Sequence, residues 1–227
     1  MRESVREYWL EFNRPLEGRV NYMYLDTKGL VSTGVGNLID ATKKALTAPN
    51  AEERAASLRM AGQLDWRAED GSVATPEQVA AEWDLVKSRM SLASRGGGAY
   101  RSLTSLRISE EEIDRFVFVK LDQFEHHLKG RHEFATFDSW PADAQLGLLS
   151  MSWGLGPAFK FPKFQAFVAA GDWNGAATEC RFNPERGTIV KRNDLNQELF
   201  RNAARVVAEG LDPDALVLAQ RSEPLYR

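Results

Sequence analysis

Residues 17–38 read EGRVNYMYLDTKGLVSTGVGNL, and this stretch decides the predicted fold. Two tyrosines alternate with apolar residues in its first half, a pattern that predicts a β-strand. The run DTKG suits a turn, since aspartate can bond its own backbone at the first position and glycine tolerates the last. The run LVST then returns as a second strand and ends at GVG. Such a hairpin would bring Ser32 back towards Asp26, with Glu17 across a gap.

Two carboxyl groups and a hydroxyl close together are what hydrolysis of a glycosidic bond requires. One carboxyl must be protonated, to give its proton to the leaving oxygen, and the other must be ionised, to handle a water molecule or bond the sugar. Different environments can hold the pKa values of two such groups apart. The same spacing is also typical of solvated surface carboxylates beside a hairpin. From these residues alone, both interpretations stay open.

Composition sets further bounds. The chain has 227 residues, 43% of them hydrophobic, which is enough for one large domain or two lobes with a buried core. Its net charge of −3 does not indicate nucleic-acid binding. No stretch approaches the roughly 20 apolar residues of a membrane span, so no membrane association is expected. Cys180 is the single cysteine, which excludes an internal disulfide, and it is interpreted as a small buried hydrophobe.

Helical periodicity and capping patterns recur along the rest of the chain. The expected helices cover 4–13, 51–64, 76–90, 110–128, 142–153, 162–170, 173–180, 191–206 and a short stretch from 212. Loops are expected at 95–98 and 182–187. His126, His127 and His132 fall near the end of one helix and point to different sides of it, so they are interpreted as surface groups that share no metal.

Residues 17–38 resemble the N-terminal signature of the T-even phage-type lysozymes. The shared features are a Glu-Gly pair, a tyrosine two residues before the aspartate, Asp-Thr-x-Gly, and Gly-x-Gly followed by a polar residue and leucine. The resemblance implies that Glu17 is the general acid, that Asp26 positions or activates the attacking water, and that the Ser32 hydroxyl helps to hold it. Ser32 stands where the family has threonine, and Asn37 stands where relatives usually carry histidine.

The likeness covers roughly residues 5–40 and 108–205 in the correct order. The run MSWGLG, from Met151, resembles a Met-x-aromatic-x-x-Gly segment beside the family's cleft, and the run from Arg192 resembles its arginine-rich closing helix. The substrate-binding residues that the resemblance implies are Leu38, Trp153 and Arg192. A core position for Trp153 and a solvated charge at a helix start for Arg192 are the alternatives.

The resemblance implies a mainly helical α+β fold of the two-lobed lysozyme type. An N-terminal catalytic lobe, 1–107, would bear the β-hairpin and carry a helical insertion, 41–107. The inter-lobe helix and a helical C-terminal lobe would follow over 108–227. The implied activity is hydrolysis of the β-1,4 bond between N-acetylmuramic acid and N-acetylglucosamine in bacterial peptidoglycan, with inversion and without a metal or other cofactor.

Two other functions stay open from the sequence. A catalytically inactive peptidoglycan-binding module could keep the same fold, although a binder does not need a protonatable pair of carboxyls. An adaptor could use the inserted helices to contact another protein. We expect a monomer made in the cytoplasm without a signal peptide, which would act on the wall in the periplasm after release, injection or secretion. An immunity protein is the expected partner of an antibacterial effector, because a producer must protect its own wall.

Overall fold

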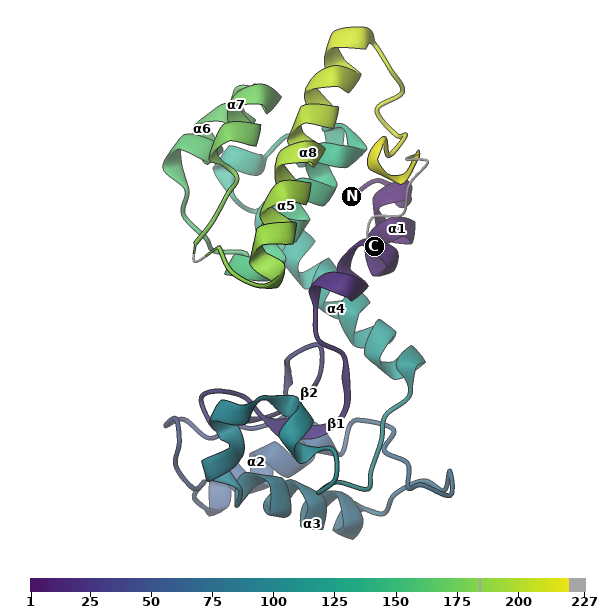
Figure 1. The fold of residues 1–227 in the computed structure, drawn as a ribbon, viewed down its shortest axis with the longest axis vertical. Helices are drawn as coiled ribbons and strands as arrows, with labels where there is room; N and C mark the ends of the chain where they lie inside the picture. Colours follow the sequence, from purple (N-terminus) through teal and green to yellow (C-terminus); the bar gives the residue numbers. More distant parts are fainter. Residues whose placement is uncertain (184, 221–227) are drawn as a thin grey trace. The chain divides into compact units, whose positions relative to one another are not determined.

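The computed structural model describes residues 1–183 and 185–220 (Figure 1). Pro184, in the predicted loop 182–187, lies outside the described residues. The fold is mainly helical, with 58% helix and 7% strand, and its small sheet is antiparallel. The prediction of a mainly helical α+β protein is therefore confirmed. No helix in the described part of the chain has the length and apolar character needed to cross a membrane.

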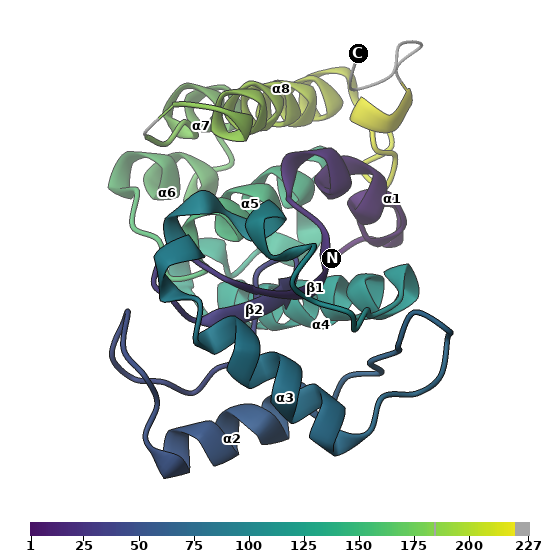
Figure 2. The same cartoon turned by 60° about the horizontal axis from the view of Figure 1, so that its bottom comes forward.

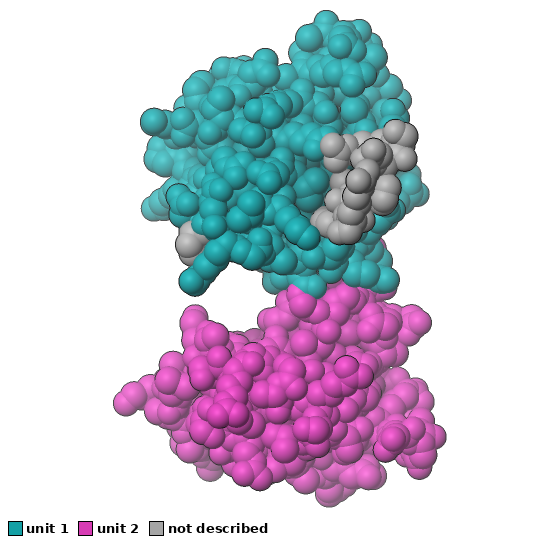
Figure 3. Space-filling view, in the orientation of Figure 1, with its two compact units in different colours: residues 1–17, 119–227 teal, residues 18–118 magenta. Residues whose placement is uncertain are grey.

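The chain forms two compact units (Figure 3). Unit 1 comprises 1–17 and 119–227, and unit 2 comprises 18–118. The chain enters unit 2 after Glu17 and returns to unit 1 within helix α4(Glu110–Lys129). These boundaries lie at other residues than those of the predicted lobes, and the division into lobes stays a prediction.

Unit 2 contains the predicted hairpin and one strand more. Strands β1(Val20–Leu25) and β2(Val31–Gly34) pair antiparallel, as predicted, and β2 also pairs with β3(Asn37–Leu38), which was not predicted. The register places Leu25 opposite Val31, so the DTKG run lies in the connecting turn. Gly34, at φ +64°, and Gly36, at φ +81°, use the left-handed conformations that glycine tolerates and turn the chain into β3.

Helix α3(Pro76–Lys87) covers the hairpin in unit 2, and α2(Ala51–Ala61) lies on the other side of α3 (Figure 2). Helix α3 packs against β1 and β2, and α2 packs against α3. Each begins at a capping box, Asn50 with Glu53 and Thr75 with Gln78. Short 3₁₀ helices follow, η2(Met90–Arg95) and η3(Gly97–Tyr100), and η3 packs against β1. The predicted loop at 95–98 is thus mostly 3₁₀ helix, and Met90 lies outside α3.

Helix α5(Ala142–Leu155) is the core of unit 1, because every residue from Ala142 to Trp153 is buried. An apolar helix of this kind needs cover on all sides. Helices α8(Thr188–Glu209) and α1(Glu3–Asn13) pack directly against it, and α6(Pro162–Ala169) with α7(Trp173–Glu179) pack beside α8 (Figures 1 and 2).

Two helix predictions in unit 1 were wrong. Helix α8 starts at Thr188 instead of 191, so the buried Arg192 and Asn193 lie in its second turn instead of at its start. The short helix expected from Asp212 begins only at Leu218, as the 3₁₀ helix η6(Leu218–Gln220), and a turn precedes it. Backbone N–H groups that a helix would have used are donated instead to the buried Asp143 carboxylate, from Val217 at 2.8 Å and Leu218 at 3.1 Å.

Candidate functional site

Glu17 is the last residue of the first segment of unit 1 and directly follows the 3₁₀ helix η1(Arg14–Leu16). Pro15 breaks the pattern of α1 as the sequence predicted, and the chain then becomes extended at Glu17, with φ −120° and ψ 141°. The Glu17 side chain is 26% exposed, so its carboxyl is largely removed from water. Its Oε1 accepts a hydrogen bond of 2.5 Å from Nη2 of Arg192 on α8.

Arg192 is a buried cation with a fixed guanidinium. Its side chain is 1% exposed. Besides Glu17, Nη2 donates to Oδ1 of Asn13 at 3.3 Å, and Nη1 donates to Oγ and O of Ser150 at 3.2 and 3.3 Å. The planar fork of arginine suits such a site, because its donors hold several acceptors in one geometry. The interpretation of Arg192 as a solvated charge was wrong, while its contact with a substrate stays a prediction.

A second cation faces the same carboxyl. Burial raises the pKa of Glu17 above its ordinary value, and the positive charges of Arg192 and Lys120 oppose that rise without cancelling it. Burial lowers the pKa of Lys120, opposed by the charge of Glu17 and reinforced by that of Arg192. The pKa values of Glu17 and Lys120 therefore depend on each other, and the carboxyl keeps its proton to a higher pH than a solvated glutamate does.

Lys120 also lies over the Trp153 ring, with Nζ 4.3 Å from the ring centroid. Trp153 is 6% exposed and packs against Trp9 and Phe124, at ring-centroid distances of 5.3 and 5.8 Å. This is the packing of a core residue. The expected role of Trp153 as an aromatic face for a sugar stays a prediction.

The other predicted carboxyl, Asp26, lies in unit 2, in the turn between β1 and β2. Its Oδ1 accepts hydrogen bonds from the backbone N–H groups of Lys28 at 2.8 Å and Leu30 at 2.9 Å. The Asp26 backbone N–H donates to Leu30 O, and Gly29 N–H donates to Asp26 O, both at 2.9 Å. No described residue donates a hydrogen bond to Oδ2. The turn therefore fixes the plane of the carboxylate through one oxygen and leaves the other for a further partner.

Ser32 occupies the middle of the sheet, opposite Tyr24 of β1 and Leu38 of β3, and is 2% exposed. Thr33, its neighbour, donates from Oγ1 to Val20 O at 3.2 Å, as expected of a residue on the other face of β2. Leu38 is 45% exposed, so the apolar surface expected for substrate contact is open to solvent in unit 2.

Asn37 has a structural role that fits its place in the signature. Its Oδ1 accepts a hydrogen bond from the Val35 N–H at 3.2 Å and lies 2.8 Å from where a Cβ on Gly34 would be. The amide thus closes the tight turn from β2 into β3, and a larger residue than glycine at position 34 would clash with it.

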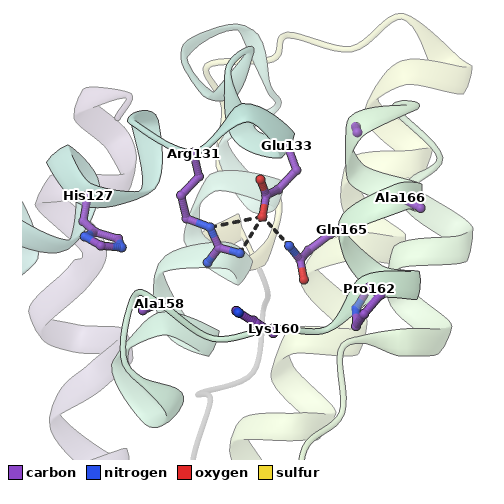
Figure 4. Close-up of a pocket in the computed structure, with 9 residues that line it drawn as sticks. His127, Arg131, Glu133, Ala158, Lys160, Pro162, Gln165 and Ala166 are labelled. Atoms are coloured by element: carbon purple, nitrogen blue, oxygen red, sulfur yellow. Dashed lines mark hydrogen bonds and ion pairs between the residues drawn. The ribbon is translucent and has the colours of Figure 1, made fainter.

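The hollow in Figure 4 belongs to unit 1 and lies at the C-terminal end of α4 and the start of α6. Arg131 and Glu133 form an ion pair of 2.6 Å there, and Gln165 donates to the same carboxylate oxygen of Glu133. Arg131 also donates to Pro157 O at 2.8 Å. The charged groups at the centre of this hollow therefore hold the segment after α4, the 156–161 loop and α6 together.

The structure brings Arg192 to Glu17 in unit 1 and places Asp26, Ser32 and Leu38 on the hairpin of unit 2. Sequence reasoning missed Lys120. Its spacing could have indicated it. Lys120 lies four residues from both Phe116 and Phe124, which places a cation on the aromatic face of α4.

No protein family profile matches the chain, and no curated protein sequence does. No group of three or more His, Cys, Asp or Glu side chains among residues 1–183 and 185–220 is arranged to hold a metal ion. His126, His127 and His132 are exposed, which confirms that they are surface groups.

Proposed function

We propose that the protein is a peptidoglycan hydrolase of the lysozyme type, with a two-lobed lysozyme fold. It would cut the β-1,4 bond between N-acetylmuramic acid and N-acetylglucosamine. The observation that carries the proposal is the environment of Glu17. A carboxyl whose pKa is raised by burial, and whose orientation is fixed by a buried arginine, is suited to general acid catalysis.

In the proposed reaction, Glu17 gives its proton to the glycosidic oxygen as the bond from the anomeric carbon to that oxygen breaks. Asp26 acts in its ionised form and takes a proton from the water that attacks the anomeric carbon, while Ser32 orients this water. The product would have the inverted configuration. Inverting enzymes keep their two carboxyls about 6.5–9.5 Å apart, which leaves room for the water.

The two hydrogen bonds from backbone N–H groups to Oδ1 of Asp26 support this assignment, because they fix the direction of the carboxyl group. They also leave Oδ2 for the water. Arg192 would hold Glu17 in place, and Leu38 and Trp153 would contact the glycan. The proposed partners are peptidoglycan and, for an antibacterial effector, an immunity protein.

The test is mass spectrometry of the soluble products from purified peptidoglycan sacs. A muramidase releases fragments with reducing muramic acid ends, and an inverting one gives the α-anomer first, which proton NMR detects early in the reaction. Anhydro-muramic ends would indicate a transglycosylase and would contradict the proposed use of water. Sedimentation of the protein with the sacs, without any release of fragments, would favour the inactive binding module.

A further inference from the structure

The turn that contains Asp26 is hydrogen-bonded by the segment that follows the sheet, residues 39–107 of unit 2. Two backbone carbonyls of the turn accept hydrogen bonds from this segment. Lys28 O accepts from the Leu46 N–H at 2.8 Å, and Gly29 O accepts from Nζ of Lys87 at 2.8 Å. The donors come from a loop and from the last residue of α3, both far along the chain from the turn.

Lys87 makes a second bond that ties the turn to the returning strand. Its Nζ donates to Oδ2 of Asp40 at 2.8 Å, and the same oxygen accepts the Val31 N–H at 2.9 Å. Oδ1 of Asp40 accepts the N–H of Thr42 at 2.8 Å and its hydroxyl at 2.5 Å. The Lys87 side chain is 4% exposed and that of Asp40 is 0% exposed. A buried ion pair with every oxygen bonded has a single geometry, because any other leaves a charge unpaired.

The charge of Asp40 is secured by these contacts. Burial alone would raise its pKa, but the hydrogen bonds from Lys87, Thr42 and Val31 lower the pKa below its ordinary value. The Asp40 carboxyl therefore stays ionised at neutral pH.

Side chains also pack closely against Gly29 of the turn. Gly29 has φ +71°, and a Cβ there would lie 2.9 Å from Sδ of Met90 and 3.0 Å from Cδ2 of Leu46. Trp83, one helical turn before Lys87 on α3, donates from Nε1 to Ile39 O at 2.9 Å. Trp83 and Lys87, on one face of α3, thus donate hydrogen bonds to the chain after β2 and before it.

We propose that Lys87 and Asp40 are positioning residues for Asp26, and that α3 with the neighbouring loops is the device that sets the orientation of this carboxylate. The inference rests on the proposed role of Asp26 as the base. The Asp26 carboxylate is oriented by the N–H groups of Lys28 and Leu30. The position of these N–H groups depends on the turn, and Lys87 fixes the turn by its hydrogen bond to Gly29 O. A misplacement of about 1 Å costs roughly 10²-fold in rate, so this chain of contacts matters to the chemistry.

The experiment compares Lys87→Met with the double variant Lys87→Met/Asp40→Asn. The single variant leaves a buried carboxylate without its partner and can fail to fold. The double variant removes both charges and keeps an acceptor oxygen at position 40. The matched control is Glu82→Gln, which alters a buried carboxyl on the same helix. Glu82 accepts from the N–H groups of Ser105 and Leu106 and does not contact the turn.

At a temperature where each variant is folded, both Lys87 variants are expected to lose about 10- to 100-fold in kcat on peptidoglycan fragments, with KM little changed. Glu82→Gln is expected to keep the parent kcat. A folded double variant with the parent kcat would overturn the inference, as would a loss in kcat that Glu82→Gln shares.

Amide hydrogen exchange tests the same clamp without using activity. In the double variant the N–H groups of Lys28 and Leu30 are expected to exchange about tenfold faster, since the turn opens locally. The N–H of Ile108, which donates to Asn21 O at 2.9 Å beside β1, serves as the reference and should keep its rate. Unchanged exchange at Lys28 and Leu30 would overturn the clamp, whereas an inactive parent protein would contradict the proposed function and leave this measurement valid.

Discussion

Glu17 and Asp26 are carboxyls held by different kinds of partner. Glu17 accepts a hydrogen bond from the buried Arg192, and the charge of the half-buried Lys120 also acts on it; both cations come from helices far along the chain. Asp26 is bound by the backbone of its own turn, through the N–H groups of Lys28 and Leu30. Charged partners change how readily a carboxyl gives up its proton, while a turn mainly fixes its direction. This difference is the reason why we propose proton donation for Glu17 and orientation of a water for Asp26.

The largest expected effect is the loss of activity in Glu17→Gln. Glutamine keeps the shape of the side chain but has no proton to give, and general acid catalysis contributes about 10²–10⁴-fold to a rate. The release of reducing ends from peptidoglycan sacs is therefore expected to fall by about that factor. Glu11→Gln, an exposed carboxyl on α1, is the matched control and should be as active as the parent. Equal activity of Glu17→Gln and the parent would remove Glu17 from the reaction.

Removal of Arg192 should have a large effect on stability. Arg192→Met removes four hydrogen bonds and leaves the largely buried Glu17 without its main partner. Breaking a buried ion pair from one side costs about 3 kcal/mol in the free energy of unfolding. Arg201→Met, at an exposed position on the same helix, should cost less than about 0.5 kcal/mol. Urea unfolding measures both, and similar losses for the two variants would show that Arg192 does not anchor this side of unit 1.

Two variants of Asp26 should distinguish the role of its charge from the role of its hydrogen bonds in the turn. Asp26→Asn keeps an oxygen for the two backbone N–H groups, so the turn and the stability are expected to persist while activity falls about 10²-fold. Asp26→Ala removes the acceptor too, and two lost hydrogen bonds are expected to cost about 1–2 kcal/mol in unfolding free energy. Activity assays and thermal unfolding of the pair test this. A stable and active Asp26→Asn would contradict the role of a base.

These two environments also differ in what the sequence can predict. The turn around Asp26 was predicted from neighbouring residues, because aspartate and glycine at the two ends of DTKG select it locally. The capping box of Asn50 and Glu53 was predicted for the same reason. The partners of Glu17 depend on which distant helices meet. Arg192 was expected only from the resemblance, and Lys120 was missed.

Misses elsewhere have the same cause. A helix was predicted from Asp212. Instead, the N–H groups of Val217 and Leu218 donate hydrogen bonds to the buried Asp143, some 70 residues earlier in the chain. Lys87 is the last residue of α3, and nothing in the neighbouring sequence indicates that it is buried against Asp40. A single sequence contains the local rules of helices and turns, whereas these contacts are decided by tertiary packing.

The smallest expected effect is a shift in pH dependence in Lys120→Met. Activity needs Glu17 protonated, so kcat/KM is expected to fall as pH rises through the pKa of Glu17. The positive charge of Lys120 lowers that pKa, and its removal should therefore raise the pKa further above the ordinary value and move the alkaline limb of the profile to higher pH. Lys129→Met is the control, because its site lies nine residues further along α4, about 13 Å by the helical rise and beyond a Debye length. A limb that moves to lower pH in Lys120→Met, or that moves equally in Lys129→Met, would show that the pKa of Glu17 is not set by the cation beside it.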